Sequence, residues 1–141
     1  MERAPKPFLT AEWRYLAMLN FEIDPAIIQP FVPAGTELDE HDGKNFVSLV
    51  AFLFLDTRVL GIPIPFHRNF EEVNLRFYVR RKTNDGWKRG VVFIKEIVPR
   101  SMIALVAQYK YNEPYIGLPM SHQIETRAGV LHSVRYNWRF D

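Results

Sequence analysis

The sequence contains no cysteine among its 141 residues, which excludes disulfides, thiolate zinc sites and thiol nucleophiles. It also lacks the glycine-rich phosphate loop, the dinucleotide fingerprint and the Gly-x-Ser-x-Gly signature of serine hydrolases. The four histidines, His41, His67, His122 and His132, stand far apart and without metal-ligand spacing. We therefore expect neither a metal nor a cofactor.

Charge of one sign and long apolar runs are also scarce. The formal net charge is +2, and the densest cationic run is Arg80-Arg81-Lys82, which is too short for a nucleic-acid site. The longest apolar run, residues 46–55, cannot span a bilayer, and the first residues contain no apolar signal segment. We expect one cytoplasmic domain over residues 1–141, with neither nucleic acid nor membrane as a partner.

Apolar side chains are abundant, and their spacing predicts a mainly β, antiparallel fold. Hydrophobic residues make up 48% and aromatic residues 14% of the chain, enough for a core. Strand-like patterns cover residues 11–23, 46–55, 70–81, 87–98, 122–127 and 130–140. Asp24-Pro25 predicts a short helix, with aspartate as the N-cap. Residues 102–111 fit a helix or a strand, and their spacing favours the helix.

The most informative segment is the strand predicted at residues 70–81. Its side chains alternate between an apolar face and a polar face. The apolar face contains Val73, Leu75, Phe77 and Val79, and the polar face contains Glu72, Asn74, Arg76 and Tyr78. The polar face is either a solvated ladder or the lining of a pocket, and spacing alone favours the ladder.

The Asn84-Asp85-Gly86 segment predicts a hairpin that joins this strand to the next. A three-residue loop pairs Asn74 with Glu96 and Arg76 with Ile94, whereas a two-residue loop would set Lys95 against Arg76. The first register avoids two like charges and is favoured. A lysine in a dry pocket can form a Schiff base, but this register leaves Lys95 on the face of Leu75, with its ammonium toward water.

Three segments together resemble the acetoacetate decarboxylase superfamily, and most closely its uncharacterised YqjF-like branch, DUF2071. They are FEEVNLRFYV at residues 70–79, EPYIGLPMSHQ at 113–123, and the strand, short helix and proline of residues 15–33. The resemblance implies a partly closed antiparallel β-barrel with one or two short helices. It also implies a central polar cavity toward which Glu72 points.

The resemblance also implies which chemistry is absent. Where the decarboxylases carry a Schiff-base lysine and its lysine neighbour, this chain has Met120 and Ser121, so decarboxylase activity is not expected. Glu72 remains the candidate catalytic residue. The candidate ligand-binding residues are Asn74, Arg76, Tyr78, Tyr115, Met120 and His122.

The sequence is compatible with three functions. The first is binding of a small polar, carbonyl or carboxylate compound, with Arg76 as the counter-ion. The second is a lysine-free lyase, hydratase or isomerase in which Glu72 is the general acid/base, with His67 or His122 nearby. The third is a structural or interaction domain. Relatives in this family are usually longer, so a homodimer in which a second copy completes the barrel is also considered.

Overall fold

The computed structural model describes residues 7, 9–103 and 114–140 and consists mainly of β-strands. The main path of a seven-stranded sheet runs β1 (Leu9–Ile23), β3 (Asn45–Val59), β5 (Phe70–Thr83), β6 (Gly86–Pro99) and β7 (Tyr115–Leu118). The short strands β2 (Glu37–Leu38) and β4 (Ile62–Pro63) pair with β5 and β3, respectively. A separate hairpin contains β8 (Met120–Arg127) and β9 (Val130–Trp138). The helical elements are α1 (Pro25–Ile28), η1 (Gln29–Phe31) and η2 (Arg100–Met102).

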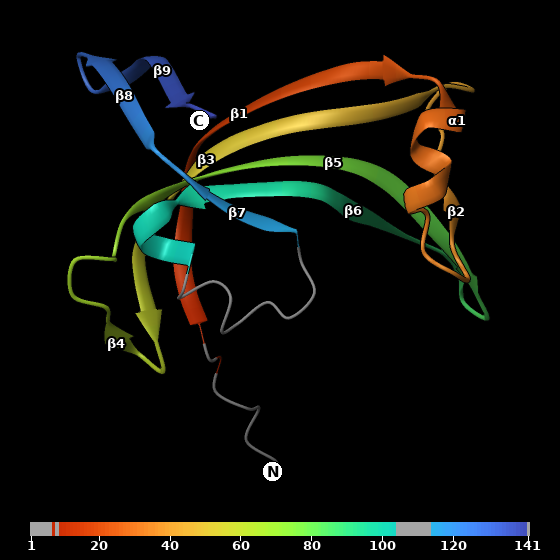
Figure 1. Cartoon of the computed structure of the whole chain (residues 1–141), viewed down its shortest axis with the longest axis horizontal. Helices are drawn as coiled ribbons and strands as arrows, with labels where there is room; N and C mark the ends of the chain where they lie inside the picture. Colours follow the sequence, from red (N-terminus) through yellow and green to blue (C-terminus); the bar gives the residue numbers. More distant parts are fainter. Residues whose placement is uncertain (1–6, 8, 104–113, 141) are drawn as a thin grey trace.

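The sheet forms an open arch (Figure 1). The hairpin β8–β9 lies on the convex side, and η2 lies beneath the concave side. The predicted mainly β fold is confirmed, but the described sheet is not closed into a barrel, because β1 and β7 are its two ends. None of the described helices has the length and apolar character of a membrane-spanning segment.

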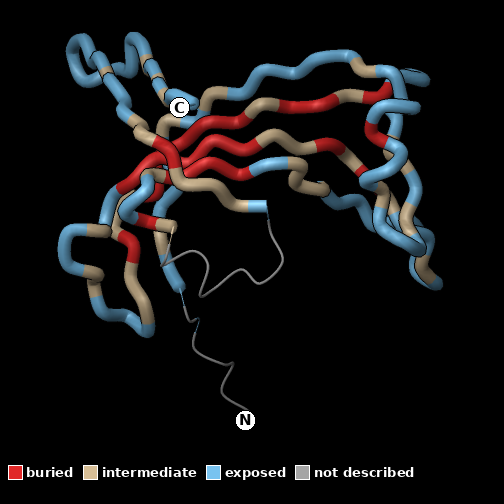
Figure 2. The backbone as a smooth tube through the Cα atoms, viewed as in Figure 1, coloured by how far each residue is buried: buried red, intermediate tan, exposed pale blue. Residues whose placement is uncertain are grey.

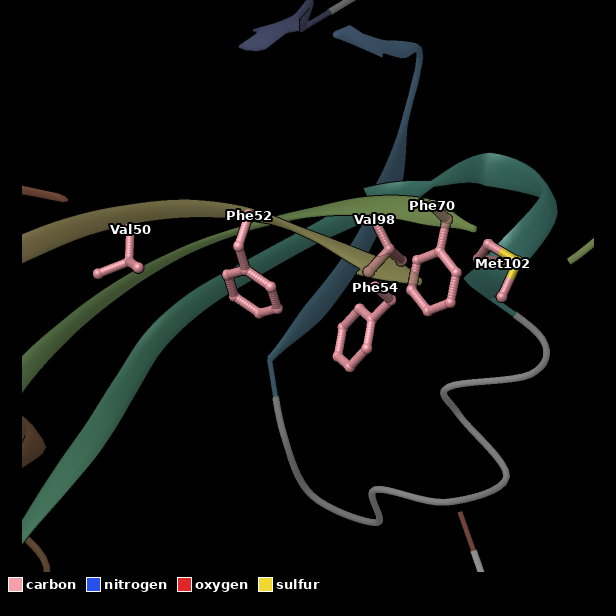
Figure 3. Packing of buried hydrophobic residues seen from close by; sticks show 6 residues of the cluster. All are labelled: Val50, Phe52, Phe54, Phe70, Val98 and Met102. Atoms are coloured by element: carbon pink, nitrogen blue, oxygen red, sulfur yellow. The ribbon is translucent and has the colours of Figure 1, made fainter. Parts of the chain in front are cut away.

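Both faces of the central strands are buried (Figure 2). On the concave face, an aromatic cluster packs under the arch (Figure 3). Its buried members are Val50, Phe52, Phe54, Phe70, Val98 and Met102. On the convex face, Val73 and Ala51 pack beneath β8–β9, and α1 brings Ile28 against Phe77 and Val79. The apolar face predicted for residues 70–81 is therefore core, as Val73 and Phe77 are fully buried.

The helix start predicted at Asp24-Pro25 is confirmed. The Asp24 side chain accepts a hydrogen bond from the Ala26 amide at 2.9 Å, and Pro25 takes the first helical position. Most of the helix predicted at residues 102–111 lies outside the described residues. Its first residue, Met102, is the last residue of the 3₁₀ turn Arg100–Met102.

Two β-bulges change the predicted faces. The β5–β6 loop has two residues, which pairs Arg76 with Phe93, and a bulge between Arg76 and Leu75 then shifts the register by one. The predicted partner Ile94 is wrong, as is the expectation that a two-residue loop would set Lys95 against Arg76. The predicted pairing of Asn74 with Glu96 is confirmed, because the bulge shifts the register and places Lys95 opposite Leu75. In β1, a bulge between Arg14 and Ala17 breaks the predicted alternation.

The structure has two short strands, β4 and β7, in segments where the sequence predicted no regular element. The proline-rich segment after residue 58 contains β4, which folds back onto β3. Tyr115–Leu118 pairs in parallel with β6, so the sheet is mixed rather than wholly antiparallel. Four residues between Pro114 and Pro119 carry no alternation long enough to predict this strand.

Candidate functional site

A polar row lies on the concave face of β5 (Phe70–Thr83), which is flanked by β3 and β6. Glu72 is 3% exposed and Asn74 is 2% exposed, while Arg76 and Tyr78 are partly buried. Glu72 faces Phe52 across the ladder, within the aromatic cluster. Glu72 and Asn74 are therefore not part of a solvated ladder.

A hydrogen-bonded chain joins three strands at the Tyr78 end of the row. The Ser48 hydroxyl donates to Asn20 Oδ1 at 2.5 Å and lies 2.6 Å from the Tyr78 hydroxyl. Because a serine hydroxyl has one hydrogen, the Tyr78 hydroxyl must be the donor to Ser48. This leaves the Asn20 amide nitrogen as a donor, and a lone pair on the Tyr78 oxygen as an acceptor.

A pocket of about 480 Å³ opens beside these hydrogen bonds, next to the loop that follows β2. It is lined by Asn20, Asp39, Glu40, His41, Phe46, Tyr78, Arg89, Gly90 and Val91. The Asp39 amide donates to the Tyr78 carbonyl at 3.0 Å, which fixes the β2–β3 loop against β5. The pocket therefore combines polar groups on its sheet wall with the apolar surfaces of Phe46 and Val91.

A bidentate ion pair stands at the same pocket. Arg89 donates from Nε to Asp39 Oδ2 at 2.6 Å and from Nη2 to Asp39 Oδ1 at 3.2 Å. The hydrogen bond to Asp39, followed by its charge, raises the pKa of the Arg89 guanidinium. Asp39 thus occupies Arg89, and the arginine of the polar row, Arg76, lies beside the pocket rather than among the residues that line it.

Arg76 lies two residues from Tyr78 on the same face, opposite Ser48 and Phe93. Its Nε is buried and has no hydrogen-bond partner among the described residues. No described carboxylate forms an ion pair with it. A buried donor on a cation is costly unless an acceptor satisfies it, so this position suits an anionic ligand.

Two buried carboxyl groups lie deeper along the row. Asn74 donates to Glu72 Oε1 at 3.3 Å and faces Glu96 across the β5–β6 ladder. Glu96 is fully buried and accepts a hydrogen bond from the Tyr115 hydroxyl at 2.9 Å. The strand pairing thus gathers Glu72, Glu96 and Tyr115 around Asn74.

Two predicted site residues lie on the other face of the sheet. Met120 packs against the convex cluster of Val73 and Leu118. His122 Nδ1 lies 2.6 Å from Glu71 Oε1, and Glu71 points to the convex face because it neighbours Glu72 in the strand. His122 therefore joins the sheet to the hairpin and does not meet the polar row.

The hairpin makes a second polar contact through Tyr136. Its hydroxyl donates at 2.7 Å to the carbonyl of Tyr15, which sits at the β1 bulge with φ 56°. Burial, and secondarily the charge of Glu71, raises the pKa of Tyr136 to about 12.

We expect Tyr136 to ionise later than an ordinary tyrosine and to link folding to alkaline pH. The fold prefers the neutral phenol, so its contribution to stability is full below the unfolded pKa of about 10. That contribution is lost as the pH rises toward about 12. Tyrosinate absorbance during an alkaline titration should show a late step that Tyr136→Phe removes. An unchanged titration curve in the variant would contradict this assignment.

The structure thus brings together Glu72, Asn74, Arg76, Tyr78 and Tyr115 from the predicted site, and separates Met120 and His122 from them. The sequence interpretation missed Asn20 and Ser48. Ser48 carried a signal, since it is a hydroxyl within an otherwise apolar strand. The position of Asn20 in its strand gave no comparable signal. Within the described residues, no three His, Asp or Glu side chains gather closely enough to hold a metal ion.

Comparison with known proteins adds two similarities. Residues 10–141 match the model of the DUF2071 family, described as an uncharacterized conserved protein. The chain is also 29% identical over 112 residues to the uncharacterized protein YqjF of Bacillus subtilis (strain 168). That match covers 79% of this chain and 45% of YqjF, so the matched part is less than half of that relative.

Proposed function

Because the chain belongs to the DUF2071 family, whose description states no activity, we propose its function from the site: it binds a small organic anion. The observation that carries this proposal is the buried Arg76 Nε, which has no acceptor among the described residues. A carboxylate of a cytoplasmic keto or hydroxy acid would supply that acceptor and the missing negative charge.

The rest of the ligand would occupy the pocket that begins at Tyr78, two residues from Arg76 on the same face of β5. The Asn20 amide and the Tyr78 hydroxyl offer a donor and an acceptor for a hydroxyl or carbonyl group. Phe46 and Val91 line the pocket of about 480 Å³ and suit a short aliphatic or aromatic body. Mostly apolar walls with a few placed polar groups are typical of small-molecule sites.

We further propose that the chain shares the fold of the acetoacetate decarboxylase superfamily, in which this arch would be part of a partly closed barrel. The segments at residues 70–79 and 113–123 support this relationship, as does a polar row under the concave face. The site would work without a Schiff base, because the residue that the resemblance sets at the lysine position is Met120, a thioether that packs on the convex side.

The test of the proposal is a thermal-shift screen of small keto and hydroxy acids. A compound that binds only the folded chain raises its melting temperature by mass action. At least one carboxylate should raise the melting temperature in a saturable way, while the matching uncharged alcohols should not. If no carboxylate has an effect at any concentration, anion binding is wrong.

Tyr78→Phe should weaken the same ligand about tenfold, because it removes one hydrogen bond worth roughly 1.4 kcal/mol. Tyr136→Phe is the matched control, since Tyr136 lies on the convex side and bonds the Tyr15 carbonyl. Affinities measured by calorimetry should fall for the first variant and remain unchanged for the second. Equal affinities in both variants would remove Tyr78 from the site.

A second candidate function is acid–base catalysis by Glu72, as a lyase, hydratase or isomerase. It is favoured by the burial of Glu72 and Glu96, which are 3% and 0% exposed on one face. Buried carboxyl groups are frequent general acids and bases. Turnover of a bound acid that Glu72→Gln abolishes, with binding retained, would establish catalysis. Binding without turnover would leave the first function alone.

A further inference from the structure

Strand β1 (Leu9–Ile23) is an edge strand with 15 residues. One side pairs with β3 along nearly its whole length, and no described strand pairs with the other side. Large apolar side chains are nevertheless exposed on both of its faces: Leu9, Trp13, Leu16, Met18, Leu19 and Phe21. Leu19 and Phe21, next to one another on the convex face, are 58% and 52% exposed.

Such an edge is rarely left open. Proteins protect exposed edge strands with proline, unpaired charges, bulges or short length, and β1 has no proline and its register shifts lie before residue 17. Its charges are neutralised by neighbours: Arg14 bonds Glu12 at 2.9 Å, and Lys44 bonds Glu22 at 2.7 Å. The regular segment of residues 17–23 therefore presents free backbone groups and apolar side chains with little repulsion.

We infer that a second copy of this chain pairs with this edge, through antiparallel contact of residues 17–23 about a two-fold axis at Asn20. In this register Leu19 of each copy faces Phe21 of the other, and Met18 faces Glu22. Aromatic–aliphatic pairs across a ladder stabilise a sheet, and no like charges are opposed. Beyond the bulge, Arg14 lies toward the acidic end of the other strand at Asp24, which is complementary in charge.

The same pairing bears on the pocket. Asn20 lines the pocket and stands at the two-fold axis, so the two pockets would meet at the interface. Met18 and Glu22 share the concave face with Asn20, because they face Val50 and Phe46 across the β1–β3 ladder. The second copy would thus place these two side chains beside the pocket of the first. An isologous dimer of this kind gives one continuous sheet across both copies.

The absence of cysteine provides a direct test by cross-linking. Asn20→Cys would place two thiols in opposed positions, where Cα atoms lie about 4.5–5.5 Å apart, within the range that a disulfide needs. Mild oxidation at low protein concentration should convert this variant to a covalent dimer that reductant reverses. Val130→Cys, 69% exposed on β9, is the control and should remain monomeric on a non-reducing gel. Equal cross-linking of both variants would overturn the inference.

Mass measurement supplies the independent readout. Light scattering after size exclusion should give the mass of two chains for the unmodified protein. The double variant Leu19→Lys, Phe21→Lys sets lysines against lysines across the axis and should give the mass of one chain. Val130→Lys should stay a dimer, and circular dichroism should show that all three are folded. A monomeric unmodified protein, or a double variant that remains dimeric, would contradict the pairing.

Discussion

Replacing Arg76 by methionine is expected to lower the affinity for a small carboxylate about a hundredfold. A charge-assisted pair in a partly buried site contributes roughly 3 kcal/mol, which corresponds to that ratio. Methionine keeps most of the side-chain volume and removes only the charge and the donors. Calorimetric titration with the best acid from the thermal-shift screen measures the loss.

The same substitution should not destabilise the unliganded chain. Arg76 has no described ion-pair partner, and its buried Nε has no described acceptor. Replacing an uncompensated, partly buried cation by an apolar side chain is neutral or stabilising. The melting temperature without ligand should therefore stay the same or rise. Arg81→Met, exposed on the same strand, is the matched control and should bind like the unmodified chain. Loss of binding in both variants would show that general charge, rather than Arg76, attracts the anion.

Replacing Phe77 by alanine is expected to destabilise the fold by about 3–5 kcal/mol, the usual range for deleting a buried phenylalanine side chain. Phe77 is fully buried on the convex face, where Ile28 of α1 and Val79 pack beside it. The deletion leaves a cavity between α1 and β5, and it removes contacts from the strand that bears the polar row. Urea unfolding curves give the free energy of unfolding.

Phe66→Ala is the matched control for this prediction. Phe66 is 101% exposed, so the same chemical deletion removes no packing, and the free energy of unfolding should change by less than about 0.5 kcal/mol. If Phe77→Ala also changes the free energy of unfolding by only this amount, the apolar face of β5 is not the core of this domain. The orientation of the polar row on the opposite face would then lose its basis.

The sequence predicted the local features whose cause is local. The alternation at residues 70–81 separates Glu71 from Glu72, and the structure points them to opposite faces. Glu71 meets His122 on the convex side, and Glu72 lies 3% exposed on the concave side. The helix at Asp24-Pro25 follows from one side-chain hydrogen bond and the fixed φ of proline. These features depend on neighbours within a few residues.

Features that depend on strand pairing were not predictable in the same way. The β5–β6 bulge, which lets Arg76 face Phe93 while Asn74 still faces Glu96, is a property of two strands together. The Asn20–Ser48–Tyr78 chain joins positions 28 and 30 residues apart, so no spacing rule could identify it. Met120 was assigned to the pocket through the resemblance alone. The structure instead packs it on the convex side, because β7 ends at Leu118 and β8 turns over the sheet.

The most direct test of anion binding is the NMR signal of the Arg76 side chain. The Nε–H resonance can be assigned by its absence from the spectrum of Arg76→Met, and then followed while a small keto or hydroxy acid is added. We predict a saturable shift of this resonance, because the buried Nε–H donor gains an acceptor. The Arg81 resonance should not move. An Arg76 resonance that stays in place while the acid binds elsewhere would contradict the account.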